Sequence, residues 1–429
     1  MPGWRRTFRA VWIANLVTSM GMMSFLPFFP EYLRALGVAD EGAVAVWAGA
    51  IYGAAPLTAG LMMPIWGAVG DRYGRKPMVL RSMLAIAVFV GAMAWATAPW
   101  QLFALRICQG LFSGFVAPSV TLVSVQAPAD RQGTVAGTLQ TAMAVGSAAG
   151  PFLGGLLANA VGLHNVFLCV ATAALVSAGI VTLYAQEGPR EPIERAARPG
   201  AIGVLQATLR EGVGAFGHPS LRGALILLFA MQLGMGATNP QLATYVRELL
   251  GRTGEGAPIF ALLARGTPTG GMDDVVRLGT SVLFAGIATV SLFAMPLWGR
   301  IGDRRGHGAM LLPCAAVCLV MLLSHAFVPG YGSLVVVQLL LGAAVAGLGP
   351  LAFGIAAGEI AAAQRGGAFG AVVSARTLAI SLGSIVGGAV AALVGVRWLY
   401  VLGAVVVAGA LVDARSRGIA ARVQALDER

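Results

Sequence analysis

Long apolar stretches follow one another along the whole chain, separated by short polar stretches. A stretch of about 20 apolar residues is long enough to cross the hydrocarbon core of a bilayer as a helix. Helices are expected because the bilayer core holds no water, so backbone polar groups must be satisfied within the segment. The pattern therefore predicts an all-α membrane protein with twelve transmembrane helices. The predicted spans lie near residues 10–33, 45–69, 78–97, 100–126, 133–160, 163–185, 221–246, 280–302, 309–328, 331–358, 367–394 and 397–413.

The composition supports a membrane protein and argues against a soluble enzyme. The 429 residues are 57% hydrophobic and only 11% charged, whereas soluble domains carry about 25% charged residues. The formal net charge is +11, but the basic residues stand between apolar stretches and form no patch that would indicate nucleic-acid binding. The four cysteines lie within predicted spans and show no zinc-ligand spacing. Neither a metal nor a cofactor is expected.

The distribution of basic residues predicts the orientation in the membrane. With the N-terminus inside, 21 of the 29 Lys and Arg residues fall in inner segments and 6 in outer segments, while Arg106 and Arg376 lie within spans. Cytoplasmic loops carry the excess of Lys and Arg in membrane proteins. We therefore expect a multi-pass protein of the cell inner membrane with both termini in the cytoplasm.

The chain repeats one unit twice. Residues 64–80 (PIWGAVGDRYGRKPMVL) return 232 positions later as residues 296–312 (PLWGRIGDRRGHGAMLL), and residues 106–110 align with 338–342 at the same offset. Six spans in each copy are typical of parallel-repeat transporters, which bind substrate between their halves near the bilayer midplane. The expected domains are residues 1–185 and 221–429, joined by a cytoplasmic linker over 186–220.

Three motifs resemble signatures of the major facilitator superfamily. Residues 67–76 (GAVGDRYGRK) resemble its inner-loop signature, and the match occurs in both halves. Arg106, Gln109 and Gly110 resemble the fourth-span signature of the drug:proton antiporters. The resemblance implies the major facilitator fold, with two pseudo-symmetric six-helix bundles. A third match, to the fifth-span antiporter signature, is carried by Gly146, Gly150, Pro151 and Gly154.

The inner loops are the predicted gate. The resemblance implies that Asp71 meets the N-terminus of the eleventh span when the inner side is closed, and Arg75 is placed to pair with Asp130. In the second copy His307 and Gly308 replace Arg75 and Lys76, so we expect Asp71 to matter more than Asp303. The alternative is a basic loop that only sets orientation. The gating residues are Gly67, Asp71, Arg72, Gly74, Arg75, Lys76, Asp130 and Asp303.

Polar and aromatic residues within spans are the candidates for the transport pathway. A cation in mid-span is costly and usually faces a cavity, which singles out Arg106 and Arg376, although either could instead be structural. Methionine and aromatic side chains offer an adaptable surface to lipophilic compounds, but they are equally typical of a packing core. The remaining pathway candidates are Gln109, Phe25, Met22, Gln232, Asn239 and Gln338. The glycine spacing of the fifth span indicates close helix packing, and only the resemblance links it to export.

Few acidic residues are placed to carry a proton. Multidrug-resistance members of the group, which this chain resembles, place an Asp after the eleventh-span Arg, where this chain has Thr377. The candidates are Glu31, Asp71 and Glu359, with Glu31 preferred for its place near the outer end of the first span. Arg34, one turn away, could hold Glu31 in an ordinary ion pair.

These observations predict a monomeric secondary active transporter that exports lipophilic drug-like compounds by proton antiport and so contributes to antibiotic resistance. An alternative is a major facilitator transporter, exporter or importer, for one specific metabolite or siderophore. A membrane-embedded enzyme is not expected, because no catalytic constellation lies at membrane depth. The chain also lacks the nucleotide-binding Gly-x-x-x-x-Gly-Lys-Ser/Thr motif.

Overall fold

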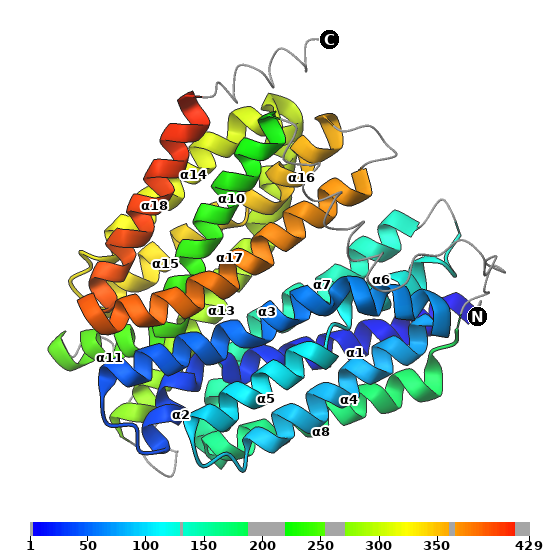
Figure 1. The fold of residues 1–429 in the computed structure, drawn as a ribbon, viewed down its shortest axis with the longest axis horizontal. Coiled ribbons are helices and arrows are strands. Elements are labelled where there is room, and N and C mark those ends of the chain that lie inside the picture. Colours follow the sequence, from blue (N-terminus) through cyan, green and yellow to red (C-terminus); the bar gives the residue numbers. More distant parts are fainter. Residues whose placement is uncertain (1–2, 129–131, 188–218, 254–270, 360–364, 417–429) are drawn as a thin grey trace. The chain divides into compact units, whose positions relative to one another are not determined.

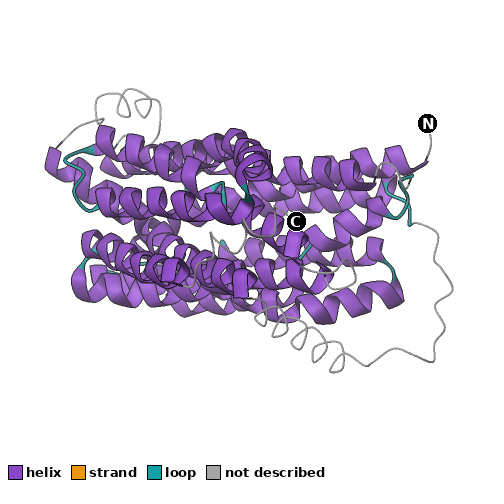
Figure 2. Cartoon of the chain, turned by 90° about the horizontal axis from the view of Figure 1, so that it is seen from above, coloured by secondary structure: helices purple, strands orange, loops and turns teal. Residues whose placement is uncertain are grey.

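The structure is a computed structural model that describes residues 3–128, 132–187, 219–253, 271–359 and 365–416. All regular elements within these residues are helical (Figures 1 and 2). Eleven of the described helical segments are long and apolar enough to cross a membrane. The chain is therefore an all-α, multi-pass membrane protein.

The described residues of the first half form eight α-helices and one 3-10 turn. They are α1 (Gly3–Phe25), η1 (Leu26–Phe28), α2 (Phe29–Ala35), α3 (Glu41–Tyr73), α4 (Arg75–Met93), α5 (Pro99–Phe112), α6 (Val116–Ser124), α7 (Gln132–Val161) and α8 (Leu163–Tyr184). The second half repeats this order. It consists of α10 (Pro219–Thr238), η3 (Asn239–Gln241), α11 (Leu242–Thr253), α13 (Met272–Arg305), α14 (His307–His325), α15 (Tyr331–Val345), α16 (Leu348–Glu359), α17 (Arg365–Val394) and α18 (Val396–Ser416).

The predicted seventh span, residues 221–246, is not among the eleven candidate segments. Its residues form α10, which ends at Thr238, then the 3-10 turn η3 and the start of α11. Pro240 has no backbone N–H to continue the helical ladder, and α11 carries Arg247, Glu248 and Arg252. The 3-10 turn thus interrupts a segment that the sequence pattern predicts as one helix, as η1 does in the first segment, which still counts as one crossing segment.

Helices are interrupted at corresponding places in the two halves. The first segment breaks at η1 and its counterpart breaks at η3. The fourth breaks between α5 and α6, where Gly114 adopts a φ of 124°, and its counterpart breaks between α15 and α16. Interrupted helices at matching positions of two repeats are the strongest backbone sign of a transport site. The polar residues next to these breaks are therefore candidates for the functional site.

Helix packing repeats between the halves. In the first, α1 packs against α7 and α8, and α4 packs against α8, which is visible as neighbouring ribbons in Figure 1. In the second, α10 packs against α17 and α18, and α14 packs against α18. Each of these three contacts in the first half has its counterpart in the second. The repeat seen in the sequence is thus also a repeat of packing.

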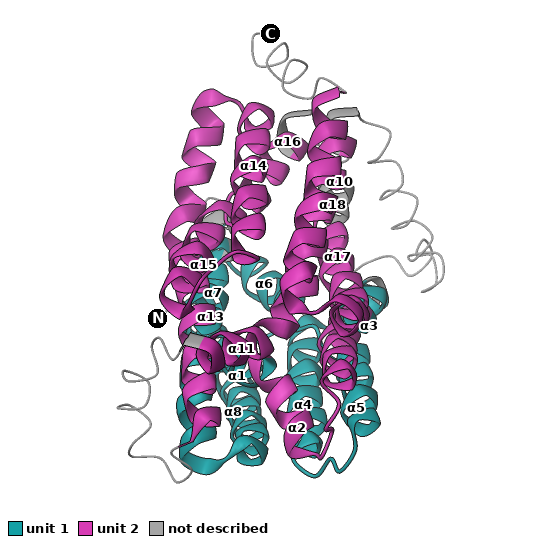
Figure 3. Ribbon diagram, turned by 90° about the vertical axis from the view of Figure 1, so that its left-hand side faces the viewer, with its two compact units in different colours: residues 1–26, 58–207 teal, residues 27–57, 208–429 magenta. Residues whose placement is uncertain are grey.

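Close contacts group the chain into two compact units, residues 1–26 with 58–207 and residues 27–57 with 208–429 (Figure 3). Residues 27–57 join the second unit because α3 approaches α17 at glycine positions. A Cβ atom on Gly49 would lie 2.2 Å from the carbonyl oxygen of Ser384, so only glycine allows this approach. Gln241 also donates a hydrogen bond of 2.9 Å to the carbonyl oxygen of Ala45. The domain boundary expected at 186–220 stays a prediction, because residues 188–218 lie outside the described residues.

Candidate functional site

Four of the predicted pathway residues lie together in the first unit. Arg106 is only 2% exposed, and its guanidinium donates a hydrogen bond of 2.7 Å to Oε1 of Gln109. The amide of Gln109 donates to the sulfur of Met22 at 3.2 Å. The guanidinium carbon of Arg106 lies 5.9 Å from the ring centroid of Phe25, within the range of cation–π attraction. Helices α1 and α5 thus bring a buried cation, an amide and two soft apolar groups to one place.

The end of α5 positions this Arg106 cluster. The helix ends at Phe112, and the backbone N–H of Ser113 donates to the carbonyl oxygen of Gln109 at 2.8 Å. Gly114 then takes a positive φ that other residues rarely adopt, which turns the chain into α6. Gln109 and Arg106 therefore occupy the last turns before a helix break. Such a break is the feature that the two repeats share.

The predicted glycine stripe of α7 lies against the backbone of α1. A Cβ atom on Gly146 would lie 2.7 Å from Cβ of Ser19, and one on Gly154 only 1.9 Å from the carbonyl oxygen of Ser24. Pro151 lies inside the helix, next to Gly150. The stripe therefore lets two helices approach at backbone distance, as small residues do in membrane proteins. This packing holds α1, and with it Met22 and Phe25, in place.

Replacing Gly154 with alanine is expected to lower the thermal midpoint of the purified protein by several degrees. The added methyl group overlaps the α1 backbone, and overpacking costs about 1–3 kcal/mol. Gly137→Ala in the same helix is the matched control, because a Cβ atom there meets nothing within 4 Å. Alanine favours a helix more than glycine, so the control should leave the midpoint unchanged or slightly raised. Equal midpoints for both variants would contradict the close-packing role.

A second polar cluster lies in the second unit. The Nε of Arg277 donates to Oε2 of Glu31 at 2.7 Å, and its Nη1 donates to Oδ1 of Asp274 at 2.9 Å. The three residues are 8%, 4% and 0% exposed, respectively. The other carboxylate oxygen of Glu31, Oε1, is buried and has no hydrogen-bond partner among the described residues. We call Glu31, Asp274 and Arg277 the acidic triad.

The other charged residues near the triad form separate ion pairs with one another. Arg34 forms two hydrogen bonds with Glu41, at 2.8 and 2.6 Å, and a third with Thr244 at 3.1 Å. Arg247 pairs with Asp273. The alternative that Arg34 holds Glu31 is therefore wrong, because the guanidinium of Arg34 is bound to Glu41. The partner of Glu31 is Arg277.

The remaining pathway candidates lie outside the Arg106 cluster and the acidic triad. Gln338, the repeat counterpart of Arg106, lies 2.5 Å from Nε2 of the buried His325 rather than in an open pathway. Gln232 is buried in α10, Asn239 is half-buried in η3, and Arg376 is exposed on α17. The two clusters that geometry supports are therefore the Arg106 cluster and the acidic triad.

Comparison with known proteins identifies the family. The profile of the Major Facilitator Superfamily matches residues 11–271 and 269–417. The chain belongs to this superfamily. It is 30% identical over 405 residues to the multidrug resistance protein MdtG of Citrobacter koseri, covering 94% of this chain and 93% of the relative. It is also 29% identical to the multidrug resistance efflux pump PmrA homolog of Lactococcus lactis, covering 81% of this chain and 78% of the relative.

Solved structures of transporters share the fold. The nucleoside transporter NupG superposes with a TM-score of 0.74 at 14% identity, covering 96% of this chain and 98% of the other. A bacterial homolog of the human lysosomal transporter Spinster gives a TM-score of 0.76 at 12% identity, covering 99% and 98%. At such identities the likeness supports the major facilitator fold alone. As a member of this family, the chain is a membrane transporter of small molecules and not an enzyme.

The inner loop of this facilitator differs from the expected form. Residues 67–73 belong to α3, which continues to Tyr73, and α4 begins at Arg75. The chain reverses at Gly74 alone, with a φ of 112°, and Gly306 repeats this turn with a φ of 84°. The residues of the inner-loop signature, 67–76, therefore lie in two helices apart from Gly74, because a single glycine with positive φ makes the turn. A Cβ atom on Gly67 would meet nothing within 4 Å.

Contacts at the first inner turn join α4 to the end of α8. The carboxylate of Glu187 accepts hydrogen bonds from the backbone N–H groups of Arg75 and Lys76, at 2.9 and 2.8 Å. The ammonium of Lys76 donates to the carbonyl oxygens of Thr182 and Ala185, at 2.9 and 2.7 Å. An anion at a helix N-terminus and a cation at a C-terminus are both favourable for the helix dipole. Sequence reasoning missed Glu187.

The second inner turn is held by contacts of the His307 side chain. His307 approaches Asp303 at 3.3 Å. Its ring also fills the space beside two glycines, since a Cβ atom on Gly354 would lie 1.9 Å and one on Gly302 would lie 2.8 Å from Cδ2 of His307. The two turns are thus held differently. The side chains of Asp71, Arg72 and Glu359, and all of Asp130, lie outside the described residues, so their predicted roles stay predictions.

Sequence reasoning also missed Asp274 and Arg277. It placed both before the predicted eighth span, which begins near residue 280, whereas α13 begins at Met272. A signal was present, because Asp274 and Arg277 are separated by one helical turn and directly precede an apolar stretch.

Proposed function

We propose that this facilitator exports lipophilic, drug-like compounds across the cell inner membrane in exchange for protons, with both termini in the cytoplasm. The full-length similarity to a multidrug resistance protein supports the substrate class. The excess of basic residues in the predicted inner segments supports the orientation. The Arg106 cluster supplies one buried cation and an amide among aromatic and thioether groups, a lining that suits large apolar compounds.

The acidic triad carries the proposal of proton coupling. Two carboxylates and one guanidinium leave a net charge of −1 in a buried place. An uncompensated buried charge is costly, and one proton bound by the triad makes it neutral. Oε1 of Glu31 accepts no hydrogen bond among the described residues. A proton can therefore bind this oxygen without displacing a hydrogen-bond donor. We assign the coupling proton to Glu31.

The function is tested in inside-out vesicles or proteoliposomes with a panel of lipophilic dyes and drugs, together with polar metabolites. We expect uptake of several unrelated lipophilic compounds under an imposed pH gradient, and loss of that uptake when an ionophore collapses the gradient. Transport of one metabolite alone would support the alternative of a specific transporter. Uptake that ignores the pH gradient would contradict proton antiport while leaving drug export intact.

A further inference from the structure

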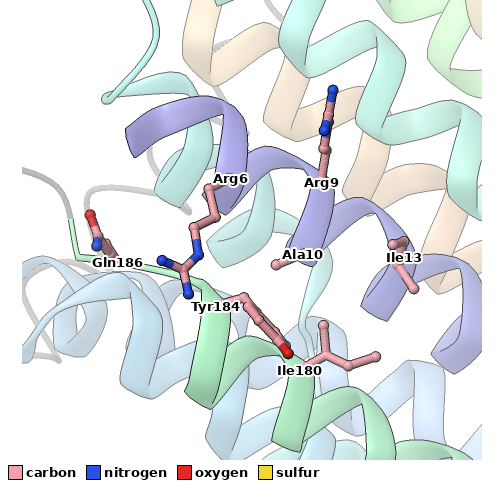
Figure 4. A pocket seen from close by; sticks show the side chains of 7 residues that line it. All are labelled: Arg6, Arg9, Ala10, Ile13, Ile180, Tyr184 and Gln186. Carbon is pink, nitrogen blue, oxygen red and sulfur yellow. The ribbon is translucent and has the colours of Figure 1, made fainter. Parts of the chain in front are cut away.

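The first unit has a cavity of about 550 Å³ between the beginning of α1 and the end of α8 (Figure 4). Arg6, Arg9 and Ile13 of α1 line one side, and Ile180, Tyr184 and Gln186 line the other. In Figure 4 the side chain of Arg6 extends from α1 toward Tyr184 and Gln186. Neither the Arg106 cluster nor the acidic triad includes any of these residues.

The polarity of the cavity changes along the helix axis. Arg6 and Arg9 lie in the first turns of α1, and Tyr184 and Gln186 lie at the end of α8. Ile13 is seven residues further along α1 than Arg6, which is about 10 Å in a helix. Ile13 is 43% exposed although it belongs to a membrane-crossing segment. The cavity lining therefore changes from cationic at the start of α1 to apolar further along the helix.

The polar end of the cavity is held in shape by the fold. The backbone N–H of Gln186 donates to the hydroxyl of Thr7 at 3.1 Å, and its carbonyl oxygen accepts from Gln126 at 2.9 Å. The guanidinium carbon of Arg6 lies 5.3 Å from the centroid of the Tyr184 ring. The neighbouring carboxylate of Glu187 is turned to the N-terminus of α4. The guanidinium of Arg6, a phenol and an amide thus lie together at the cavity mouth.

We propose that this cavity binds an anionic phospholipid, with the phosphate at Arg6 and an acyl chain along Ile13 and Ile180. Guanidinium groups match phosphate oxygens as bidentate donors. Basic pockets between membrane helices are sites for anionic headgroups. A free phosphate would use only the polar end, and a cationic compound would be repelled by Arg6. The bound lipid also stabilises the end of α8, which is clamped to α4 by Lys76 and Glu187.

The test measures lipid binding to the purified full chain in detergent by thermal shift and native mass spectrometry. Phosphatidylglycerol is compared with phosphatidylcholine of the same acyl chains and with glycerol 1-phosphate. We expect saturable stabilisation by phosphatidylglycerol and little effect from the other two. In Arg6→Gln, half-saturation should require about fivefold more phosphatidylglycerol, as expected for the loss of one cation at a membrane surface.

The matched control is Arg5→Gln, which removes the same charge from the same helix end. Arg5 lies over Trp4, at 5.5 Å from the ring centroid, and does not line the cavity. Its half-saturation should equal that of the unmodified protein. Equal losses in Arg5→Gln and Arg6→Gln would overturn the site in favour of diffuse attraction. Equal binding of phosphatidylcholine would overturn the anionic preference, and equal stabilisation by glycerol 1-phosphate would overturn the lipid as occupant.

Discussion

Replacing Glu31 with glutamine is expected to reduce pH-gradient-driven transport to background while preserving exchange of labelled for unlabelled substrate. Glutamine keeps an oxygen that accepts the hydrogen bond from Arg277, so the local packing survives. Arg277 then stays paired with Asp274, and the pair carries no net charge. Substrate binding and the conformational cycle do not need the proton in substrate exchange. The measurement is both kinds of transport in one proteoliposome preparation.

Two further variants test whether Glu31 itself carries the proton. Glu41→Gln removes a carboxylate from the same unit, but Glu41 is bound to Arg34 and its side chain is 60% exposed. This control should transport as the unmodified protein does. Asp274→Asn leaves Glu31 with Arg277 and should retain measurable coupling if Glu31 is the proton carrier. Gradient-driven transport that persists in Glu31→Gln and disappears in Asp274→Asn would move the proton to Asp274. Persistence in both would remove the triad from coupling.

The sequence predicted the features that depend on residues close together in the chain. Apolar length predicts the membrane-crossing helices, and a repeated turn with glycine predicts a chain reversal. Arg106 and Gln109 are one helical turn apart, so their contact follows from helix geometry. The glycine spacing of α7 predicts a close helix neighbour, although it does not say that the neighbour is α1.

The features that sequence reasoning missed depend on distant pairing. Arg277 is 246 residues from Glu31, and no local pattern connects them. Glu187 follows the end of α8, yet its partners are the first residues of α4. Local reasoning offered Arg34 as an alternative partner of Glu31, because neighbours one turn apart are the pairs that a single sequence displays. In the folded chain Arg34 is instead hydrogen-bonded to Glu41.

Replacing Arg106 with lysine is expected to lower transport by at least about tenfold without a matching loss of folded protein. Lysine keeps the charge but loses the planar fork of donors, which here reaches Gln109 at 2.7 Å while the guanidinium lies near the Phe25 ring. A hydrogen bond to a charged group contributes about 1.5–3 kcal/mol, which is a tenfold effect or more. The measurement is initial transport rate per folded protein, with Arg106→Met as the neutral variant.

The control for Arg106 is another arginine of the first unit that stacks on an aromatic ring. The guanidinium carbon of Arg81 lies 3.6 Å from the ring centroid of Trp66, outside the Arg106 cluster. Arg81→Lys should therefore change stability but not the rate per folded protein. Arg106→Lys should weaken binding of substrate or its turnover, because Gln109 and Met22 lose the group that orients them. A defect that follows only the amount of folded protein would make Arg106 a structural cation. A rate defect with normal folding places the buried cation in the transport cycle.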